Sequence, residues 1–264
     1  MLRKYVCIAS SVGLAALVYG GVAVWAQTSL GTAQSFAALG GSTVTNTGPS
    51  VLTGNLGVSP GSAITGFPPG TVTGTIHVAN AVAAQAQIDV TTQYNALVGA
   101  ACAADLSGQD LGGLTLTPGV YCFSTSAQLT GTLTLNALGS AGSTFIFKTG
   151  SSLTTASGSA VVLINGGNPC GVMWQIGSSA TVGTGTSFIG NLIALSSITL
   201  NTGSNITGRA LARNGAVTLD TNNITPCSGG PVPTLATWAA IMLMALLTLA
   251  AVATLRKRQL PALS

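Results

Sequence analysis

Ser187-Phe-Ile-Gly-Asn-Leu-Ile-Ala-Leu-Ser196 and Asn205-Ile-Thr-Gly-Arg-Ala-Leu-Ala-Arg-Asn214 are two stretches that repeat one another at an offset of 18 residues. A shorter pattern recurs beside them, as Thr181-Val-Gly-Thr184, Thr199-Leu-Asn-Thr202 and Thr218-Leu-Asp-Thr221. A self-similar period of this length, rich in Gly, Thr and Asn, is typical of a solenoid in which each coil stacks on the previous one. The repeat therefore predicts a chain dominated by short β-strands.

Composition excludes one large class of function. Only 5% of the 264 residues are charged, and glutamate is absent. The net charge of +4 comes from the ends of the chain, where Arg3, Lys4 and the run 256–258 are basic. The interior holds three basic residues against four aspartates. No basic surface remains to neutralise phosphates, so nucleic acid is not expected as a partner.

The amino terminus has the pattern of a secretory signal. Arg3 and Lys4 precede an apolar run, which ends in Val24-Trp-Ala26. A charged region, an apolar region and a small-residue cleavage site in this order predict a signal peptide over residues 1–26, cut after Ala26. The alternative is an amino-terminal membrane anchor that is not cleaved.

The carboxyl terminus, residues 231–264, has the pattern of a sorting tail. Its uncharged run 236–255 is long enough to cross a bilayer and stops at a basic cluster, which predicts a membrane helix with the body of the protein outside. Val232-Pro-Thr-Leu235 and Trp238 before this run resemble the IPTL-CTERM class of bacterial sorting tails, with Val in place of the first Ile. The resemblance implies an exported protein that the tail holds at the membrane and that a sorting protease cuts. A permanent membrane anchor is the alternative.

Cysteine usage agrees with export. Removal of the signal takes Cys7 with it and leaves Cys102, Cys122, Cys170 and Cys227, for which three connectivities are possible. Pairing Cys102 with Cys122 and Cys170 with Cys227 is favoured, because each bond would tie a loop end to a neighbouring coil. No close cysteine pair and a single histidine make a metal site a poor interpretation.

One soluble helix is expected between the strands, over about residues 77–101. Apolar residues recur there at helical spacing and would form one stripe: Val78, Val82, Ala86, Val90, Tyr94 and Leu97. That stripe needs a partner surface. If Leu192, Ala194, Ala210 and Ala212 point into the solenoid, Ile193 and Leu211 point out, and we expect the helix to cover them.

Several separate motifs resemble one known family. Residues 113–123, 168–185 and 190–225, together with an opening segment at 35–67, are similar in their order to the DUF3494 family of ice-binding-like β-solenoids. The resemblance covers about residues 30–227, and the domain is assigned to residues 27–230. It implies an irregular triangular β-helix with one long α-helix packed alongside.

Catalysis is not expected. The four aspartates are dispersed along the chain, His77 has no second histidine to act with, and no Gly-x-Ser-x-Gly elbow occurs between a strand and a helix. Arg209 and Arg213 are expected in one outward row, where they are solvated or make a salt contact at the edge; binding of an anion is the alternative. An enzyme of the polysaccharide-lyase kind would need a charged groove, and no cofactor is implied.

Hydroxyl groups are the functional candidates. Leucine or valine beside each threonine of the short repeat must point inward, so Thr181, Thr199 and Thr218 are expected in one outward column. Gly183, Asn201 and Asp220 would form a neighbouring column, with the charge of Asp220 interrupting the uncharged surface at one end. Thr132, Thr134 and Thr154 are further outward candidates on an unassigned face. With the family resemblance, this predicts an exported, monomeric protein that adsorbs to an ice crystal surface through a flat Thr/Ser/Ala-rich face. The alternatives are a structural or adhesive surface protein that contacts glycan or matrix, and threonine serving only as a strand former on a wet face.

Overall fold

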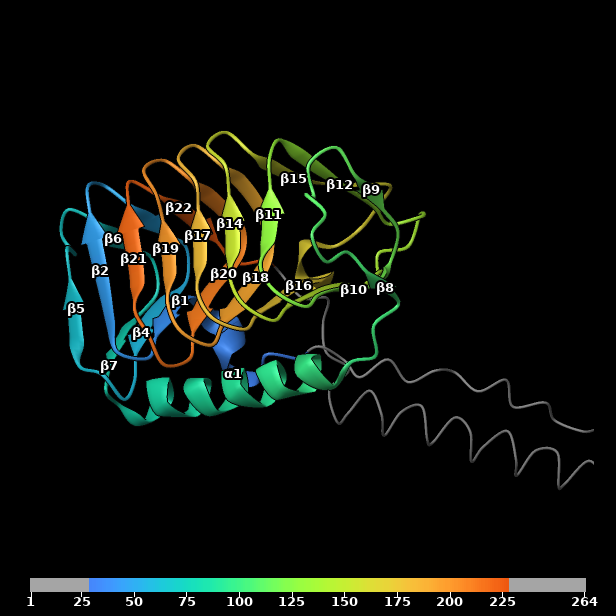
Figure 1. Ribbon diagram of the computed structural model, residues 1–264. Coiled ribbons are helices and arrows are strands. Elements are labelled where there is room, and N and C mark those ends of the chain that lie inside the picture. The colour runs from blue at the N-terminus through green and yellow to red at the C-terminus, as the bar shows by residue number, and fades with distance from the viewer. Residues whose placement is uncertain (1–28, 228–264) are drawn as a thin grey trace, which may run out of the picture.

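A computed structural model describes residues 29–227, which form a three-sided prism of stacked coils with one helix along it (Figure 1). Every strand pairing in it is parallel. The expected signal at 1–26 and the expected sorting tail at 231–264 lie outside the described residues. Within residues 29–227, no helix has the length and hydropathy needed to cross a membrane.

One side of the prism is a seven-stranded sheet that faces solvent. We call it the flat face. Its strands, in spatial order, are β11 (Ala127–Leu129), β14 (Leu153–Thr155), β17 (Ala180–Val182), β19 (Ile198–Leu200), β21 (Val217–Asp220), β2 (Thr43–Thr47) and β5 (Ala63–Thr65).

A fifteen-stranded sheet forms the other two sides. The helix-covered side contains β8 (Ala104–Asp105), β10 (Gly119–Phe123), β13 (Phe145–Thr149), β16 (Val172–Ile176), β1 (Phe36–Gly40), β4 (Asn55–Val58) and β7 (Ile76–Val78). The third side contains β9 (Thr115–Leu116), β12 (Thr132–Asn136), β15 (Ala160–Ile164), β22 (Asn223–Thr225), β3 (Val51–Leu52) and β6 (Thr71–Val72). Short 3₁₀ turns lie at Gly31–Ser35 and Pro169–Gly171.

The two long strands of the repeat join these two sides. β18 (Ser187–Ala194) and β20 (Asn205–Ala212) pair along their whole length, so each contributes one half to either side. At the bend, Gly190 and Gly208 stand opposite one another with φ of +116° and +148°. A side chain does not fit there, because a Cβ on Gly208 would lie 2.0 Å from the Gly190 carbonyl oxygen. The glycines of the repeat are therefore the corner of the prism.

The coils do not stack in the order of the chain. β1 pairs with β20 and β2 pairs with β21, so the amino-terminal coils lie on the carboxyl-terminal coil. α1 (Ala81–Gly99) then carries the chain back along the row of coils to β8 at the opposite end, from where the remaining coils return (Figure 1). Asp220 is consequently in the interior of its sheet. The expectation that it stands at an end of the column is wrong.

The helix is shorter than its apolar pattern predicts. Asn80 caps it by accepting a hydrogen bond from the Ala83 amide at 3.0 Å, and His77 belongs to β7 instead. Val78 and Val82 are exposed, so the buried stripe differs from the expected one and consists of Ala83, Ala86, Val90, Gln93, Tyr94 and Leu97. Ile193 and Leu211 are fully buried against this stripe, which confirms the predicted partner surface.

The interior of the prism is filled by the alternate residues. Leu192, Ala194, Ala210 and Ala212 belong to its main core, as expected. Aromatic rings stack at equivalent positions of successive coils, and the Phe147 and Trp174 centroids are 3.9 Å apart. The two polar atoms of this stack are satisfied: the indole Nε1 of Trp174 donates to the Ile189 carbonyl at 3.1 Å, and the hydroxyl of Tyr121 donates to the Thr117 carbonyl at 2.6 Å.

Candidate functional site

The flat face carries one column of threonines in register. Thr154 pairs with Thr181, Thr181 with Thr199, and Thr199 with Thr218. The column continues onto the amino-terminal coils, where Thr218 pairs with Thr45 and Thr45 with Thr65. Gln128 of β11 precedes Thr154 at the other end. Six threonines therefore stand on six adjacent strands, spaced by roughly 4.8 Å.

The hydroxyls of this column are directed to solvent. No hydrogen bond within residues 29–227 uses the hydroxyl of Thr154, Thr181 or Thr199, and the Thr45 hydroxyl contacts that of Thr218 at 3.4 Å, a long distance for an O–H···O bond. The neighbours of each threonine along its strand, such as Val182 and Leu200, are buried. The rigid core thus fixes the threonine backbones while the hydroxyls stay free to bind water.

A second column of small residues runs parallel to the first, two residues earlier in each strand or in the turn before it. It consists of Ser126, Ser152, Ser179, Ser197, Ala216, Thr43 and Ala63. Here the serine hydroxyls are occupied: those of Ser126 and Ser152 bond to each other at 2.9 Å, and those of Ser179 and Ser197 accept from the Ser197 and Ala216 amides at 3.3 and 3.1 Å. The two columns together make a surface of small side chains without a bulky or charged residue among them.

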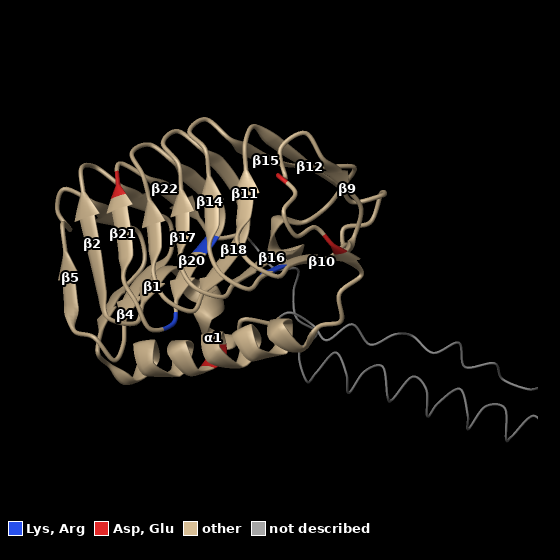
Figure 2. Cartoon of the chain, in the orientation of Figure 1, with Lys and Arg blue, Asp and Glu red and all other residues tan. Residues whose placement is uncertain are grey.

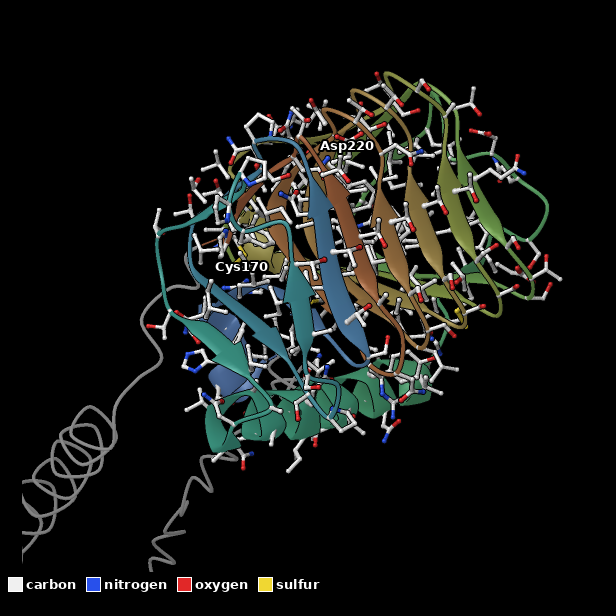
Figure 3. The ribbon with its side chains drawn as sticks, turned by 90° about the vertical axis from the view of Figure 1, so that its left-hand side faces the viewer. Cys170 and Asp220 are labelled. Carbon is white, nitrogen blue, oxygen red and sulfur yellow. A yellow bond between two sulfur atoms is a disulfide. The ribbon has the colours of Figure 1, made fainter. Side chains whose placement is uncertain are left out.

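The predicted neighbouring column lies at the corner that ends the flat face. Gly183 is buried and donates its amide to the Thr155 hydroxyl at 2.8 Å, so it offers no surface group. Asn201 is half-buried. Asp220 stands at the upper end of β21 (Figure 3), where its carboxylate accepts from the hydroxyls of Thr202 and Thr221 in the turns. These bonds hold the carboxylate at the rim rather than over the threonine column.

Thr132 and Thr134 lie on the third side of the prism, because β12 pairs with β15 and β9. Thr134 stands beside Val162, and the exposed Val162 and Ile164 make this side more apolar than the flat face. The structure thus divides the predicted site residues between two sides. Thr154, Thr181, Thr199 and Thr218 share a face, and Thr132 and Thr134 do not belong to it.

Two of the charged residues within residues 29–227 border the flat face: Asp220 at its rim, and Asp110 at its end, where it bridges to Gln128 of β11. Charged residues are few over the whole of this part of the chain (Figure 2). Arg213 lies over the ring of Tyr94, with its guanidinium carbon 4.5 Å from the ring centroid. Asp89 bonds to the Thr32 amide and hydroxyl. Burial alone would raise the pKa of Asp89, but these hydrogen bonds and one from Gln85 hold it below its ordinary value.

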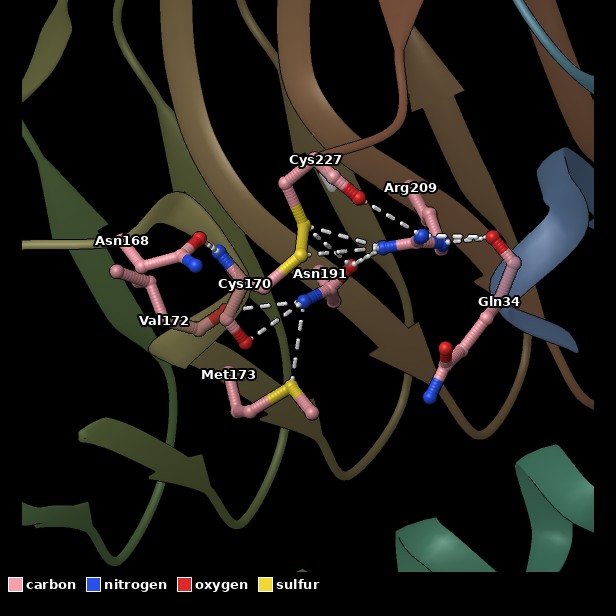
Figure 4. The surroundings of a disulfide bond; sticks show 8 residues. All are labelled: Gln34, Asn168, Cys170, Val172, Met173, Asn191, Arg209 and Cys227. Atoms are coloured by element: carbon pink, nitrogen blue, oxygen red, sulfur yellow. Dashed lines mark hydrogen bonds between the residues drawn. A yellow bond between two sulfur atoms is a disulfide. The ribbon is translucent and has the colours of Figure 1, made fainter. Parts of the chain in front are cut away.

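Arg209 is not solvated, contrary to expectation. It is 4% exposed and lies beside the disulfide between Cys170 and Cys227 (Figure 4). Its guanidinium donates to the carbonyl of Gln34 at 2.6 and 3.0 Å, to the carbonyl of Cys227 at 3.1 Å and to Oδ1 of Asn191 at 2.8 Å. Burial lowers the pKa of Arg209 to about 10. The residue therefore ties the two ends of the described chain to the central coils.

The favoured cysteine connectivity is confirmed, since Cys102 bonds to Cys122 and Cys170 to Cys227. Among residues 29–227, no three His, Cys, Asp or Glu side chains gather in a way that could hold a metal ion.

Sequence reasoning missed Thr43, Thr45 and Thr65 as members of the face. The local signal was present, because Thr43-Val-Thr and Ala63-Ile-Thr show the same alternation as Ser179-Ala-Thr before Val182 in the repeat. Only the register of β2 on β21 places them in the column.

The family model of ice-binding-like proteins matches residues 38–225. The chain belongs to the ice-binding-like family. An ice-binding protein of Nostoc sp. strain HG1 is 64% identical over 196 residues, which cover 74% of this chain and 72% of that protein. A crystal structure of an ice-binding protein from an Antarctic biological consortium superposes with a TM-score of 0.74 at 46% identity, over 76% of this chain and 91% of the other. The ice-binding protein of the Antarctic ascomycete Antarctomyces psychrotrophicus gives a TM-score of 0.74 at 39% identity, over 76% and 98% of the two chains.

Proposed function

We propose that this protein binds ice through the flat face and acts by adsorption rather than by catalysis. The observation that carries the proposal is the column of six threonines in register on adjacent strands, at Thr154, Thr181, Thr199, Thr218, Thr45 and Thr65. The names of its relatives, all described as ice-binding proteins, support it.

The physical argument rests on water. A threonine offers a methyl group that excludes disordered water and a hydroxyl that anchors one, and a parallel sheet repeats that pair at a fixed spacing of roughly 4.8 Å. The column of small Ser, Ala and Thr residues beside it keeps the surface flat. A charge would bind its own hydration shell in a competing geometry, and the carboxylate of Asp220 is held at the rim by Thr202 and Thr221. The face can therefore order water over an extended area.

Export belongs to the same proposal. Residues 1–26 direct secretion, and the apolar segment 236–255 with its basic end tethers the protein to the membrane until a sorting protease removes the tail. Two disulfides in the body suit an oxidising compartment. The exported body acts as a monomer at the ice surface. Mass spectrometry of the mature protein should show an amino terminus at Gln27, and an intact Met1 would contradict secretion by cleavage.

Thermal hysteresis and inhibition of ice recrystallisation, measured on residues 27–230, test the function directly. Adsorption predicts a freezing-point gap that grows with protein concentration and ice crystals with defined facets. A well-folded protein without either effect at high concentration would overturn ice binding.

A further inference from the structure

A cleft of about 570 Å³ opens on the helix-covered side, at the end where α1 leaves the sheet. Its lining includes Tyr94 and Val98 from the helix and Lys148 and Gln175 from β13 and β16. It lies on a different side from the flat face, and nothing in the adsorption of ice requires it. Its volume is within the range of small-molecule sites, roughly 300–1,000 Å³.

The floor of the cleft is one row of residues in register. Asp105 pairs with Cys122, Cys122 with Lys148, and Lys148 with Gln175. Further along, the same row consists of Ile193 and Leu211, which the helix covers completely. The row therefore changes from apolar to polar at the point where the cleft begins.

Two polar side chains in this cleft lack a partner in residues 29–227. Gln175 is only 4% exposed, yet its amide makes no hydrogen bond there. The same holds for the hydroxyl of Tyr94, a residue 7% exposed. The polar atoms of neither side chain are sealed from solvent, because the buried unpaired atoms of residues 29–227 belong to Asn46 and Gln87 instead. Both groups are therefore free to bond to a ligand or to ordered water in the cleft.

Lys148 adds a charged donor to the same cleft. Its ammonium donates to the carbonyls of Val98 and Ala100 at 2.7 and 2.6 Å, which occupies two of its three N–H groups. No carboxylate within the described chain pairs with it, and burial lowers the pKa of Lys148. One charged N–H of Lys148, the amide N–H groups of Gln175 and the hydroxyl of Tyr94 are thus available as donors. This set of donors suits a carboxylate.

The opposite end of the cleft offers acceptors. Asp105 receives both hydrogen bonds from Ser107 on Oδ1, which leaves Oδ2 free, and Ser124 lies beside it in the lining. These groups suit the hydroxyls of a ligand whose carboxylate is at Lys148. We propose that the cleft binds a small hydroxylated carboxylate of the sugar-acid class, with Lys148, Gln175 and Tyr94 on the carboxylate and Asp105 on the hydroxyls.

The test is isothermal titration of the oxidised protein with D-glucuronate, D-glucose and acetate. The proposal expects glucuronate to bind more tightly than either of the others, because glucose lacks the carboxylate and acetate lacks the hydroxyls. Added salt should weaken the binding, since part of it is the attraction between two charges. Equal affinity for glucose and glucuronate, or no heat with glucuronate, would overturn the proposal.

Two variants test whether Gln175 and Tyr94 bind the carboxylate. Gln175→Leu places in the row a residue of the kind it already has at Leu211, and Tyr94→Phe removes only a hydroxyl, so both should fold. Each deletes one hydrogen bond to a carboxylate and should weaken glucuronate binding about tenfold. Thr199→Tyr on the flat face is the matched control and should bind glucuronate unchanged. Full affinity in both cleft variants would contradict the assignment.

Discussion

Thr45 and Thr218 stand opposite one another on β2 and β21, although 173 residues of chain separate them. Their hydroxyls are 3.4 Å apart. The pair lies where the amino-terminal coils meet the carboxyl-terminal coil, and it makes one continuous surface out of two segments that are distant in sequence. Ice binding should therefore depend on both segments.

Thr45→Tyr tests this continuity. A tyrosine at this position would project from the flat face between Thr218 and Thr65 and hold ice away from the threonines on either side. We expect most of the thermal hysteresis to be lost, with the unfolding midpoint nearly unchanged because the side chain points to solvent. Activity at the level of the unmodified protein would mean that the amino-terminal coils take no part in the working surface.

Thr199→Tyr should have the same effect from within the repeat, because Thr199 is flanked in register by Thr181 and Thr218. Thr134→Tyr is the matched control, since it adds the same ring on the third side of the prism. Ice recrystallisation assays should separate the two variants clearly. Loss of activity in Thr134→Tyr alone would move the ice-binding surface to that third side.

Gly208→Ala should destabilise the fold by about 3 kcal/mol, from backbone strain at φ +148° and from overlap with the Gly190 carbonyl. Gly185→Ala is the comparison. Gly185 also has a positive φ, of +66°, but a Cβ there would meet no atom within 4 Å, so about 1 kcal/mol is expected. Urea unfolding followed by circular dichroism measures both. Equal losses would show that the corner tolerates a side chain.

Arg209→Lys should cost about 2 kcal/mol, because an ammonium cannot reproduce the fork that reaches Gln34, Asn191 and Cys227 together. In Arg213→Lys the replacement keeps a cation over the Tyr94 ring, and a change below about 1 kcal/mol is expected. Denaturant titrations of the two variants under oxidising conditions provide the comparison. A neutral outcome for Arg209→Lys would show that its hydrogen bonds do not hold the chain ends.

Acid should weaken the fold below about pH 4. Hydrogen bonds outweigh desolvation and lower the pKa of Asp89 and of Asp110 in the folded protein. A lowered folded pKa adds stability above the unfolded value, and this stability is lost as the pH falls through the folded pKa. Thermal unfolding at a series of pH values should show the loss, and Asp89→Asn should reduce its size. A pH dependence identical to that of the unmodified protein would exclude Asp89 from the effect.

Much of the candidate site could be predicted from sequence because strand geometry is local. Alternation between outward threonine and inward valine or leucine placed Thr181, Thr199 and Thr218 in one column, and the same logic placed Ile193 and Leu211 under the helix. The logic did not assign Thr132 and Thr134 to a side, because an alternating strand has the same pattern on any side of a prism. It also misplaced Arg209, whose burial depends on Gln34 and Cys227 arriving from the two ends of the described chain.

The sequence by itself determined the coil period, the inward and outward rows and the glycines at the bend, since each follows from contacts within one coil or between coils adjacent in the chain. Only the tertiary structure decided which coils are neighbours. The helix carries the chain back to the far end of the prism, so the carboxyl-terminal coil docks on the amino-terminal ones. That docking extends the threonine column across β2 and β5 and places Asp220 in the interior of its sheet, with its carboxylate at the rim of the face.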